Sequence, residues 1–233
     1  MSHRFYLEQP PVDGRATLST AEGLHLVQVM RVGVGEEVTL FDGSGKEYRA
    51  SVTQASKKGV ILAVLEERAV SRESTVSVTL GVALPRGDRQ AWLVEKATEL
   101  GVTRLIPLQT KRGVAQPTDQ ASERLRRGVI EASKQCGRNT LMQVAEAQSW
   151  SDFIRSNSSS AARLIAHPGT SAIEETFWQS RPAAGFVFGV GPEGGLTDEE
   201  VEQARAAAWQ LGTLGPRILR IETAALLLAA RVS

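Results

Sequence analysis

The chain has 233 residues, of which 42% are apolar and 23% charged, and this is typical of a soluble globular protein with one or two domains. Its formal net charge is +1, so any nucleic-acid binding must come from local clusters of cations and not from the total charge. With one cysteine, Cys136, three widely separated histidines and no long apolar run, the sequence excludes an intrachain disulfide and predicts no zinc site, signal peptide or membrane span.

Residues 1–72 are predicted to form a small β domain. The composition of residues 42–45, DGSG, is typical of a hairpin turn after a short apolar strand. Tyr48, Ala50 and Val52 then alternate with polar residues, as they do in a half-buried strand. Another strand is expected at 60–65. Closely spaced strands of this kind favour a small barrel or sandwich.

The polar segment 71–74, SRES, marks the expected boundary with a second domain at 73–233. From there strands and helices alternate, which predicts an α/β domain with a mostly parallel sheet covered by helices. One helix is expected to be capped by Asp88, to run to Leu100 and to end at Gly101. Another helix is expected at 122–137, and the expected strands are 76–84, 104–110, 141–147, 163–168, 185–190 and 211–215.

A glycine-rich loop follows the apolar strand in the stretch AGFVFGVGPEGGLTDEE, residues 184–200. Gly189, Gly191 and Gly194 match G-x-G-x-x-G, the dinucleotide-binding fingerprint. Thr197 and Glu200 have the spacing of a capping box, so the next helix is predicted to begin near residue 198. The loop should lie at the carboxyl end of a strand, where open α/β sheets bind ligands.

The details of this loop disfavour a dinucleotide. The capping box starts the helix after the last glycine, whereas the fingerprint helix opens inside the motif. The acidic residue expected about 20 positions downstream is missing. Glu193 and the acidic run 198–200 would repel a pyrophosphate but would attract a partly cationic ligand. The sequence therefore favours a small-ligand loop, with a purely structural turn as the alternative.

A second constellation lies near the C-terminus. Residues 214–216, LGP, form another expected glycine turn, and Arg217 and Arg220 follow it. Arginine forks can bind phosphate or a pyrimidine carbonyl, although exposed surface charge is the commoner role. The segment from Ile221 onward predicts a helix that is apolar on nearly every side, and this favours burial, either in its own chain or against another subunit.

The motifs GVGPEGGLTDEE and LGPRILRIETAA together resemble the cofactor-binding motifs of SPOUT methyltransferases. More narrowly, the chain resembles the bacterial family that methylates N3 of a uridine in 16S ribosomal RNA. The segments VMRVGVGEEVTLFDG, EKATELGVTRLIPLQTKR and EASKQCGRN are similar to further blocks of that family. The resemblance implies an N-terminal PUA-like β-barrel and a C-terminal α/β domain with a deep trefoil knot. It also implies S-adenosylmethionine as cofactor, a homodimer formed through the C-terminal domain, and a cytoplasmic enzyme acting on 16S rRNA in the assembled 30S subunit.

The resemblance also implies site residues. Arg220, assisted by Arg217, would stabilise the ionised uracil through its carbonyl oxygens. Glu222 is the nearest candidate for a general base, although it can equally anchor an arginine or cap the helix. The expected cofactor contacts are His167, Pro168, Gly189, Gly191, Glu193, Gly194, Leu214, Gly215, Ile218 and Leu219. The expected RNA contacts are Arg4, Lys57, Lys58, Lys111, Arg112, Arg138 and Asn139.

Two other functions stay open at this stage. The literal G-x-G-x-x-G match allows a dinucleotide-dependent oxidoreductase. The small β domain allows an RNA-binding protein without catalytic activity, although the intact pattern of Gly191, Glu193, Arg217 and Arg220 disfavours that reading.

Overall fold

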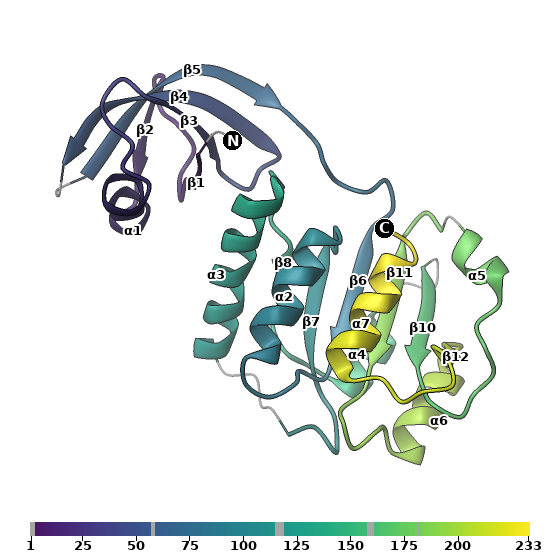
Figure 1. The fold of residues 1–233 in the computed structure, drawn as a ribbon. Helices are drawn as coiled ribbons and strands as arrows, with labels where there is room; N and C mark the ends of the chain where they lie inside the picture. Colours follow the sequence, from purple (N-terminus) through teal and green to yellow (C-terminus); the bar gives the residue numbers. More distant parts are fainter. Residues whose placement is uncertain (1–2, 57–58, 115–118, 158–160, 181) are drawn as a thin grey trace. The chain divides into compact units, whose positions relative to one another are not determined.

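The computed structural model describes residues 3–56, 59–114, 119–157, 161–180 and 182–233 (Figure 1). The chain divides into two compact units. The smaller unit contains Met1–Glu73 together with Ile130–Leu141, and the larger unit contains Ser74–Val129 and Met142–Ser233. The segment 130–141 therefore differs from the sequence-based boundary, which places it in the second domain. Across the described residues, no helix has both the length and the apolar character needed to cross a bilayer.

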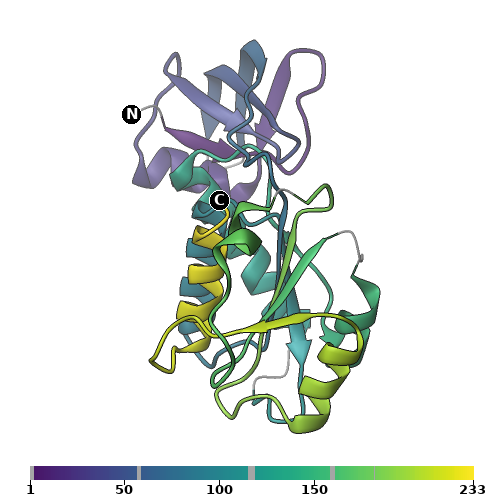
Figure 2. The same ribbon diagram turned by 90° about the vertical axis from the view of Figure 1, so that its right-hand side faces the viewer.

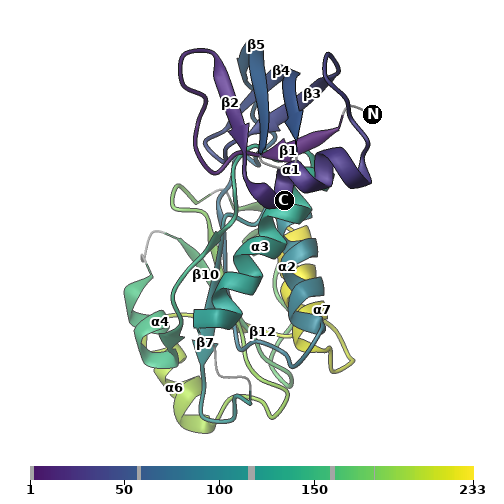
Figure 3. The ribbon, with the colours of Figure 1, turned by 90° about the vertical axis from the view of Figure 1, so that its left-hand side faces the viewer.

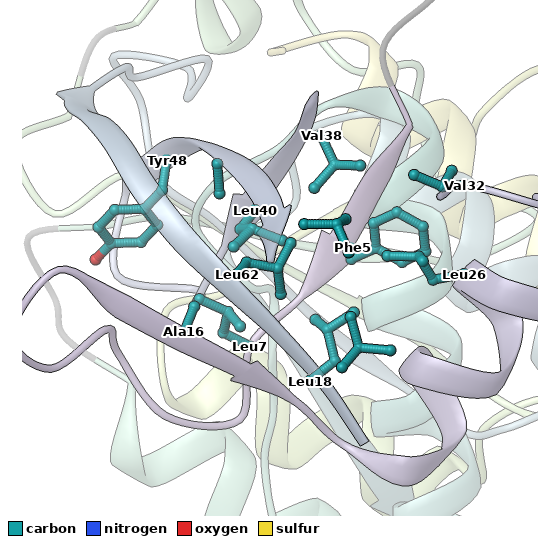
Figure 4. Close-up of a cluster of buried hydrophobic side chains, with 13 residues drawn as sticks. Phe5, Leu7, Ala16, Leu18, Leu26, Val32, Val38, Leu40, Tyr48 and Leu62 are labelled. Carbon is teal, nitrogen blue, oxygen red and sulfur yellow. The ribbon is translucent and has the colours of Figure 1, made fainter. Parts of the chain in front are cut away.

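The smaller unit is built on a sheet with the strand order β1-β3-β4-β5-β2. Its strands are β1 (Arg4–Tyr6), β2 (Arg15–Leu18), β3 (Glu37–Phe41), β4 (Lys46–Ser56) and β5 (Gly59–Ala69). In β4, Tyr48, Ala50 and Val52 are buried while Arg49 and Thr53 are exposed, so the predicted alternation is confirmed. The inward side chains of the sheet form one apolar cluster with Leu26 (Figure 4).

Two short helical segments complete this unit. Helix α1 (Thr20–Leu24) is capped by the Ser19 side chain and continues into a π-helical turn, η1 (His25–Val29). The end of α3 (Asp119–Cys136) also belongs here, and Lys134 forms a mostly buried ion pair with Glu22 of α1. This ion pair helps to hold residues 130–141 in the unit, because separating the two side chains would leave a mostly buried charge without a counter-charge.

The larger unit has a parallel sheet with the strand order β12-β10-β11-β6-β7-β8, and β9 also pairs with β7. The predicted parallel sheet is therefore confirmed. The strands are β6 (Val78–Val82), β7 (Arg104–Gln109), β8 (Gln143–Val144), β9 (Gln148–Ser149), β10 (Ala162–Ala166), β11 (Phe186–Val190) and β12 (Gln210–Gly212). Every residue of β11 is buried, as expected for a central strand with both faces covered.

Helices cover the two faces of this sheet. Helices α2 (Arg89–Glu99) and α7 (Ile221–Ala230) pack against each other on one face, and α4 (Trp150–Ser156) and α6 (Asp198–Ala206) lie on the other (Figures 2 and 3). A further short helix is α5 (Glu175–Gln179). The predicted limits of α2 are correct, but Asp88 makes no side-chain capping bond. The apolar character of α7 is explained mainly by burial within its own chain.

Gly81 and Gly189 are neighbours on β6 and β11, and the ring of Phe153 from α4 lies over them. A Cβ added at Gly81 would lie 2.4 Å from a Phe153 ring carbon, and one added at Gly189 would lie 2.4 Å from the Ile165 side chain. These glycines therefore allow α4 to approach the sheet closely.

Gly81→Ala is expected to destabilise the protein by about 1–3 kcal/mol, because the new methyl group forces the buried Phe153 ring to move. Urea denaturation followed by tryptophan fluorescence measures the change. Gly33→Ala is the matched control, since Gly33 is exposed and a Cβ there meets no atom closer than 3.8 Å. Equal stability of the two variants would contradict the close-packing interpretation.

Candidate active site

A cavity of about 290 Å³ lies at the carboxyl edge of the larger unit's sheet. Its wall is made by the segments that follow three adjacent strands, β10, β11 and β12, together with the start of α7. The register explains this grouping, because Ala166 pairs with both Val190 and Gly212, so the three strands end level with one another. This is the edge at which parallel α/β sheets bind ligands.

Most of the predicted catalytic and cofactor-binding residues line this cavity. They are His167, Pro168, Gly191, Glu193, Leu214, Arg217, Ile218, Leu219 and Arg220. Gly189, Gly194, Gly215 and Glu222 are not part of the lining. Gly189 allows the close packing of Ile165 and Phe153, and its predicted ligand contact stays a prediction.

The glycine loop has a fixed shape. A Cβ at Gly191 would lie 2.9 Å from Leu196 Cγ, and Gly195 has a φ of +72° while its N–H donates to Pro192 O at 2.8 Å. The predicted capping box is confirmed, with α6 starting at Asp198. The carboxylate of Glu200, nearly fully buried, also accepts a hydrogen bond from the Lys111 backbone N–H at 2.8 Å. The loop is therefore bound both to its own helix and to the segment after β7.

The cavity lining combines apolar side chains with a few charged groups. Glu193 lies in the segment after β11, whereas the exposed Arg217 and Arg220 lie in the segment after β12. His167 is half-buried after β10, and burial together with the nearby positive charge of Arg205 lowers the pKa of His167. Its imidazole is therefore neutral at pH 7, and it adds no charge to the cavity.

Arg89, which no sequence motif indicated, joins two parts of the site. It is the first residue of α2 and pairs with Glu193 at 3.2 Å and with Glu222 at 3.7 Å. The side chain of Glu222 is only 6% exposed, and its Oε2 accepts no hydrogen bond from any residue that the structure describes. Arg89 thus supplies the compensating charge for a buried carboxylate and connects the glycine loop to the first turn of α7.

This arrangement favours the anchoring role of Glu222 over the role of general base. The anchored arginine is Arg89 and not Arg217 or Arg220. One sequence signal could have drawn attention to Arg89. A cation in the first turn of a helix interacts unfavourably with the helix dipole, and a carboxylate close to it in space offsets that cost.

The predicted RNA contacts of the smaller unit have structural partners instead. Arg138 is 4% and Asn139 1% exposed, and they bind Glu73 and Glu47 respectively, so neither side chain is available to RNA in this conformation. Arg4 pairs with Glu47 and stacks on a phenylalanine ring. Lys57 and Lys58 lie outside the described residues.

The two predicted RNA contacts of the larger unit both touch the glycine-loop region. Lys111 forms an ion pair with Glu199 of α6. Arg112 is exposed and donates a hydrogen bond to Gly194 O at 3.0 Å. The charge of Lys111 is therefore compensated within the protein, whereas Arg112 is held by a neutral acceptor.

Arg89→Met is expected to lower the free energy of unfolding by about 1–3 kcal/mol, because it leaves the buried Glu222 carboxylate without a counter-charge. The double variant Arg89→Met/Glu222→Gln should recover most of that loss in urea denaturation, since the buried charge is then removed. Arg231→Met, which breaks an exposed pair with Glu175, is the control and should cost little. If the double variant instead lost the sum of what the two single variants lose in free energy of unfolding, Arg89 and Glu222 would not be energetically coupled.

Comparison with known proteins agrees with this geometry. Residues 72–233 match the family model of an RNA methyltransferase domain, and residues 18–65 match that of an RNA methyltransferase PUA domain. The chain is 32% identical to ribosomal RNA small subunit methyltransferase E from Synechocystis over 95% of this chain and 74% of that protein. It is also 32% identical to the Bacillus subtilis protein of the same name, covering 90% of this chain and 86% of that protein.

Solved structures show the same fold. A Neisseria gonorrhoeae ribosomal RNA small subunit methyltransferase E bound to S-adenosylmethionine is 34% identical with a TM-score of 0.89, and the match covers 99% of this chain and 96% of that one. A Legionella pneumophila protein solved with the same cofactor is 30% identical with a TM-score of 0.90, over 100% and 97% of the two chains.

The expected fold class, a PUA-like domain with a parallel-sheet α/β methyltransferase domain, is confirmed by these matches, while the trefoil knot stays a prediction. The chain therefore belongs to the RNA methyltransferase family, and its relatives there include the bacterial ribosomal RNA small subunit methyltransferases E.

Proposed function

We propose that this protein transfers a methyl group from S-adenosylmethionine to N3 of a uridine in 16S rRNA, with the assembled 30S subunit as substrate. The observation that carries the proposal is the distribution of charge around the cavity. A carboxylate, Glu193, lies in the segment after β11, and two arginines, Arg217 and Arg220, lie in the segment after β12. A cationic cofactor and an ionised uracil need these two opposite environments.

The residues of the cavity fit the proposed cofactor. Pro168, Leu214 and Leu219 provide apolar contacts, and the glycine loop brings backbone groups to the cavity. The carboxylate of Glu193 complements the positive charge of the ligand. When bound, S-adenosylmethionine supplies an electrophilic methyl group on a positively charged sulfur. Its presence in the solved relatives from Neisseria gonorrhoeae and Legionella pneumophila supports this assignment.

The two arginines have the properties needed to bind an ionised uracil. Arg220 is the N-cap residue of α7, and its side chain makes no capping bond. Both Arg220 and Arg217 are exposed and have no carboxylate partner among the described residues. Their guanidinium groups can donate to the uracil carbonyl oxygens, which stabilises the negative charge left when the N3 proton is lost. Glu222 supports this region through Arg89 and does not line the cavity.

A homodimer formed through the larger unit is part of the proposal, as is a cytoplasmic location. Helices α2 and α7 pack against each other and expose Trp92 and Leu227, which are 46% and 37% exposed. A second copy that covers this apolar surface would remove it from water. Cytoplasmic location follows from the proposed rRNA substrate.

The residues that line the cavity disfavour the alternative function of a dinucleotide-dependent oxidoreductase. Glu193 lines the cavity, and the helix after the glycine loop begins at Asp198, beyond the last glycine. Titration calorimetry with S-adenosylmethionine and with NAD separates the two functions. Binding of NAD alone would replace the proposal with an oxidoreductase.

Arg220→Ala is expected to lower the single-turnover rate of methyl transfer by about 10²–10³-fold, because it removes a donor to the uracil carbonyl. Cofactor affinity should change little. The measurement uses small subunits from a strain that lacks the modification, with the methylated base mapped. Arg155→Ala, which removes an exposed arginine paired with Asp152 on α4, is the control. An unchanged rate in Arg220→Ala, or methylation of a base other than uridine, would contradict the proposal.

Gly191→Val is expected to weaken S-adenosylmethionine binding at least tenfold in calorimetry. Its Cβ would lie 2.9 Å from Leu196 Cγ, so the loop must move where it lines the cavity. Gly33→Val is the control, because Gly33 is exposed and lies in the smaller unit. Wild-type affinity in Gly191→Val would remove the glycine loop from the cofactor site.

A further inference from the structure

The cations of the larger unit fall into two classes according to their partners. In the first class each cation forms an ion pair with a carboxylate, and its members include Arg89, Lys96, Lys111, Arg126, Arg155, Arg205 and Arg231. In the second class no carboxylate partner is present among the described residues, and its members include Arg86, Arg112, Arg124, Arg217 and Arg220. The second class keeps its full positive charge toward solvent.

The members of the second class that follow strands gather at one edge of the sheet. Arg86 lies in the segment after β6 and Arg112 in the segment after β7, while Arg217 and Arg220 follow β12. Parallel strands all end at the same edge of the sheet (Figure 1). These segments therefore leave the sheet at the edge whose other strand-end segments line the cavity. Arg104 and Arg163, which also lack a carboxylate partner within the described part of the chain, lie instead at the starts of β7 and β10.

Two of these arginines are held by neutral acceptors. Arg112 donates to Gly194 O at 3.0 Å, in the glycine loop. Arg124 of α3 donates to Gln90 Oε1 at 3.1 Å, and the buried Gln90 in turn donates to Pro85 O at 2.7 Å, just before Arg86. An amide or carbonyl oxygen restrains a guanidinium without cancelling its charge. Both side chains are nevertheless exposed.

Neighbouring Arg89 shows the opposite arrangement. Its charge is cancelled by Glu193 and Glu222, so it can hold the site together but cannot attract an anion strongly. Uncompensated arginines near one another repel, and a polyanion relieves that repulsion. Arginine also matches phosphate geometry through paired N–H donors, and a restrained fork loses less entropy on binding.

We propose that Arg86, Arg112 and Arg124 form a phosphate-binding surface that holds the sugar-phosphate backbone of the RNA beside the target base. The proposal rests on the proposed methyltransferase function and deepens it. It assigns backbone contacts to the edge of the sheet next to the cavity, in place of Arg138 and Asn139, which are buried. Arg217 and Arg220 are kept for the base itself.

The test compares Arg112→Gln and Arg124→Gln with Arg155→Gln, which removes an exposed but carboxylate-paired arginine. Binding to 16S rRNA in small subunits that lack the methyl group is measured across a series of salt concentrations. In each of the two test variants, the negative slope of log K against log salt should become shallower by about 0.7–0.9, because one phosphate contact is lost. Arg155→Gln should keep the wild-type slope.

Arg112→Lys and Arg124→Lys retain the charge and should show most of the wild-type salt dependence. This result would show that the Gln variants lose a charge and not the fold. Arg124→Gln should also keep wild-type affinity for S-adenosylmethionine in calorimetry, because Arg124 does not line the cavity.

The phosphate-binding surface would be overturned if Arg112→Gln and Arg124→Gln both kept the wild-type slope, or if Arg155→Gln made the slope shallower by the same amount. The methyltransferase function would stay intact in that case, provided that the wild-type protein methylates the subunits. If the wild-type protein neither binds nor methylates them, the proposed function itself fails, and the surface fails with it.

Discussion

The candidate site depends on the level ending of three parallel strands. Because Ala166 pairs with Val190 on one side and Gly212 on the other, the segments that follow β10, β11 and β12 all begin at the same height. A shift of one residue in either pairing would turn every side chain of that strand to the opposite face and separate these segments. The hydrogen-bonded register therefore determines where the cavity lies, and the side chains of the three following segments line it.

The charges of the site act on two scales. Within the protein, the single charge of Arg89 is shared by Glu193 and the buried Glu222, so the three side chains together keep one net negative charge, and the two pairs hold the glycine loop and the first turn of α7 in fixed relation. Towards solvent, Arg217 and Arg220 remain without a carboxylate partner in the described parts of the chain, so they are available to a negatively charged substrate. The same residue type therefore contributes stability where it is paired and, in the proposed function, recognition where it is not.

Local patterns predicted the elements well. The alternation around Tyr48 and the capping box of Thr197 with Glu200 depend on residues close in sequence, and both are found. The lining role of Glu193 also follows from its place after an apolar strand. Predictions that depended on partners far along the chain were less accurate. Arg138 and Asn139 were expected to face RNA, but carboxylates from distant segments bind and bury them.

The sequence by itself determined the order of strands and helices, the glycine loop and the two cavity arginines, because periodicity, capping and turn chemistry are local properties of the chain. The tertiary structure alone decided which cations keep a free charge. It also decided that Gly189 serves the packing of Phe153, that residues 130–141 belong to the smaller unit, and that Arg89 anchors Glu222. The physical reason is that burial and charge compensation depend on which distant residues the fold brings within a few ångströms, and no local pattern specifies those distances.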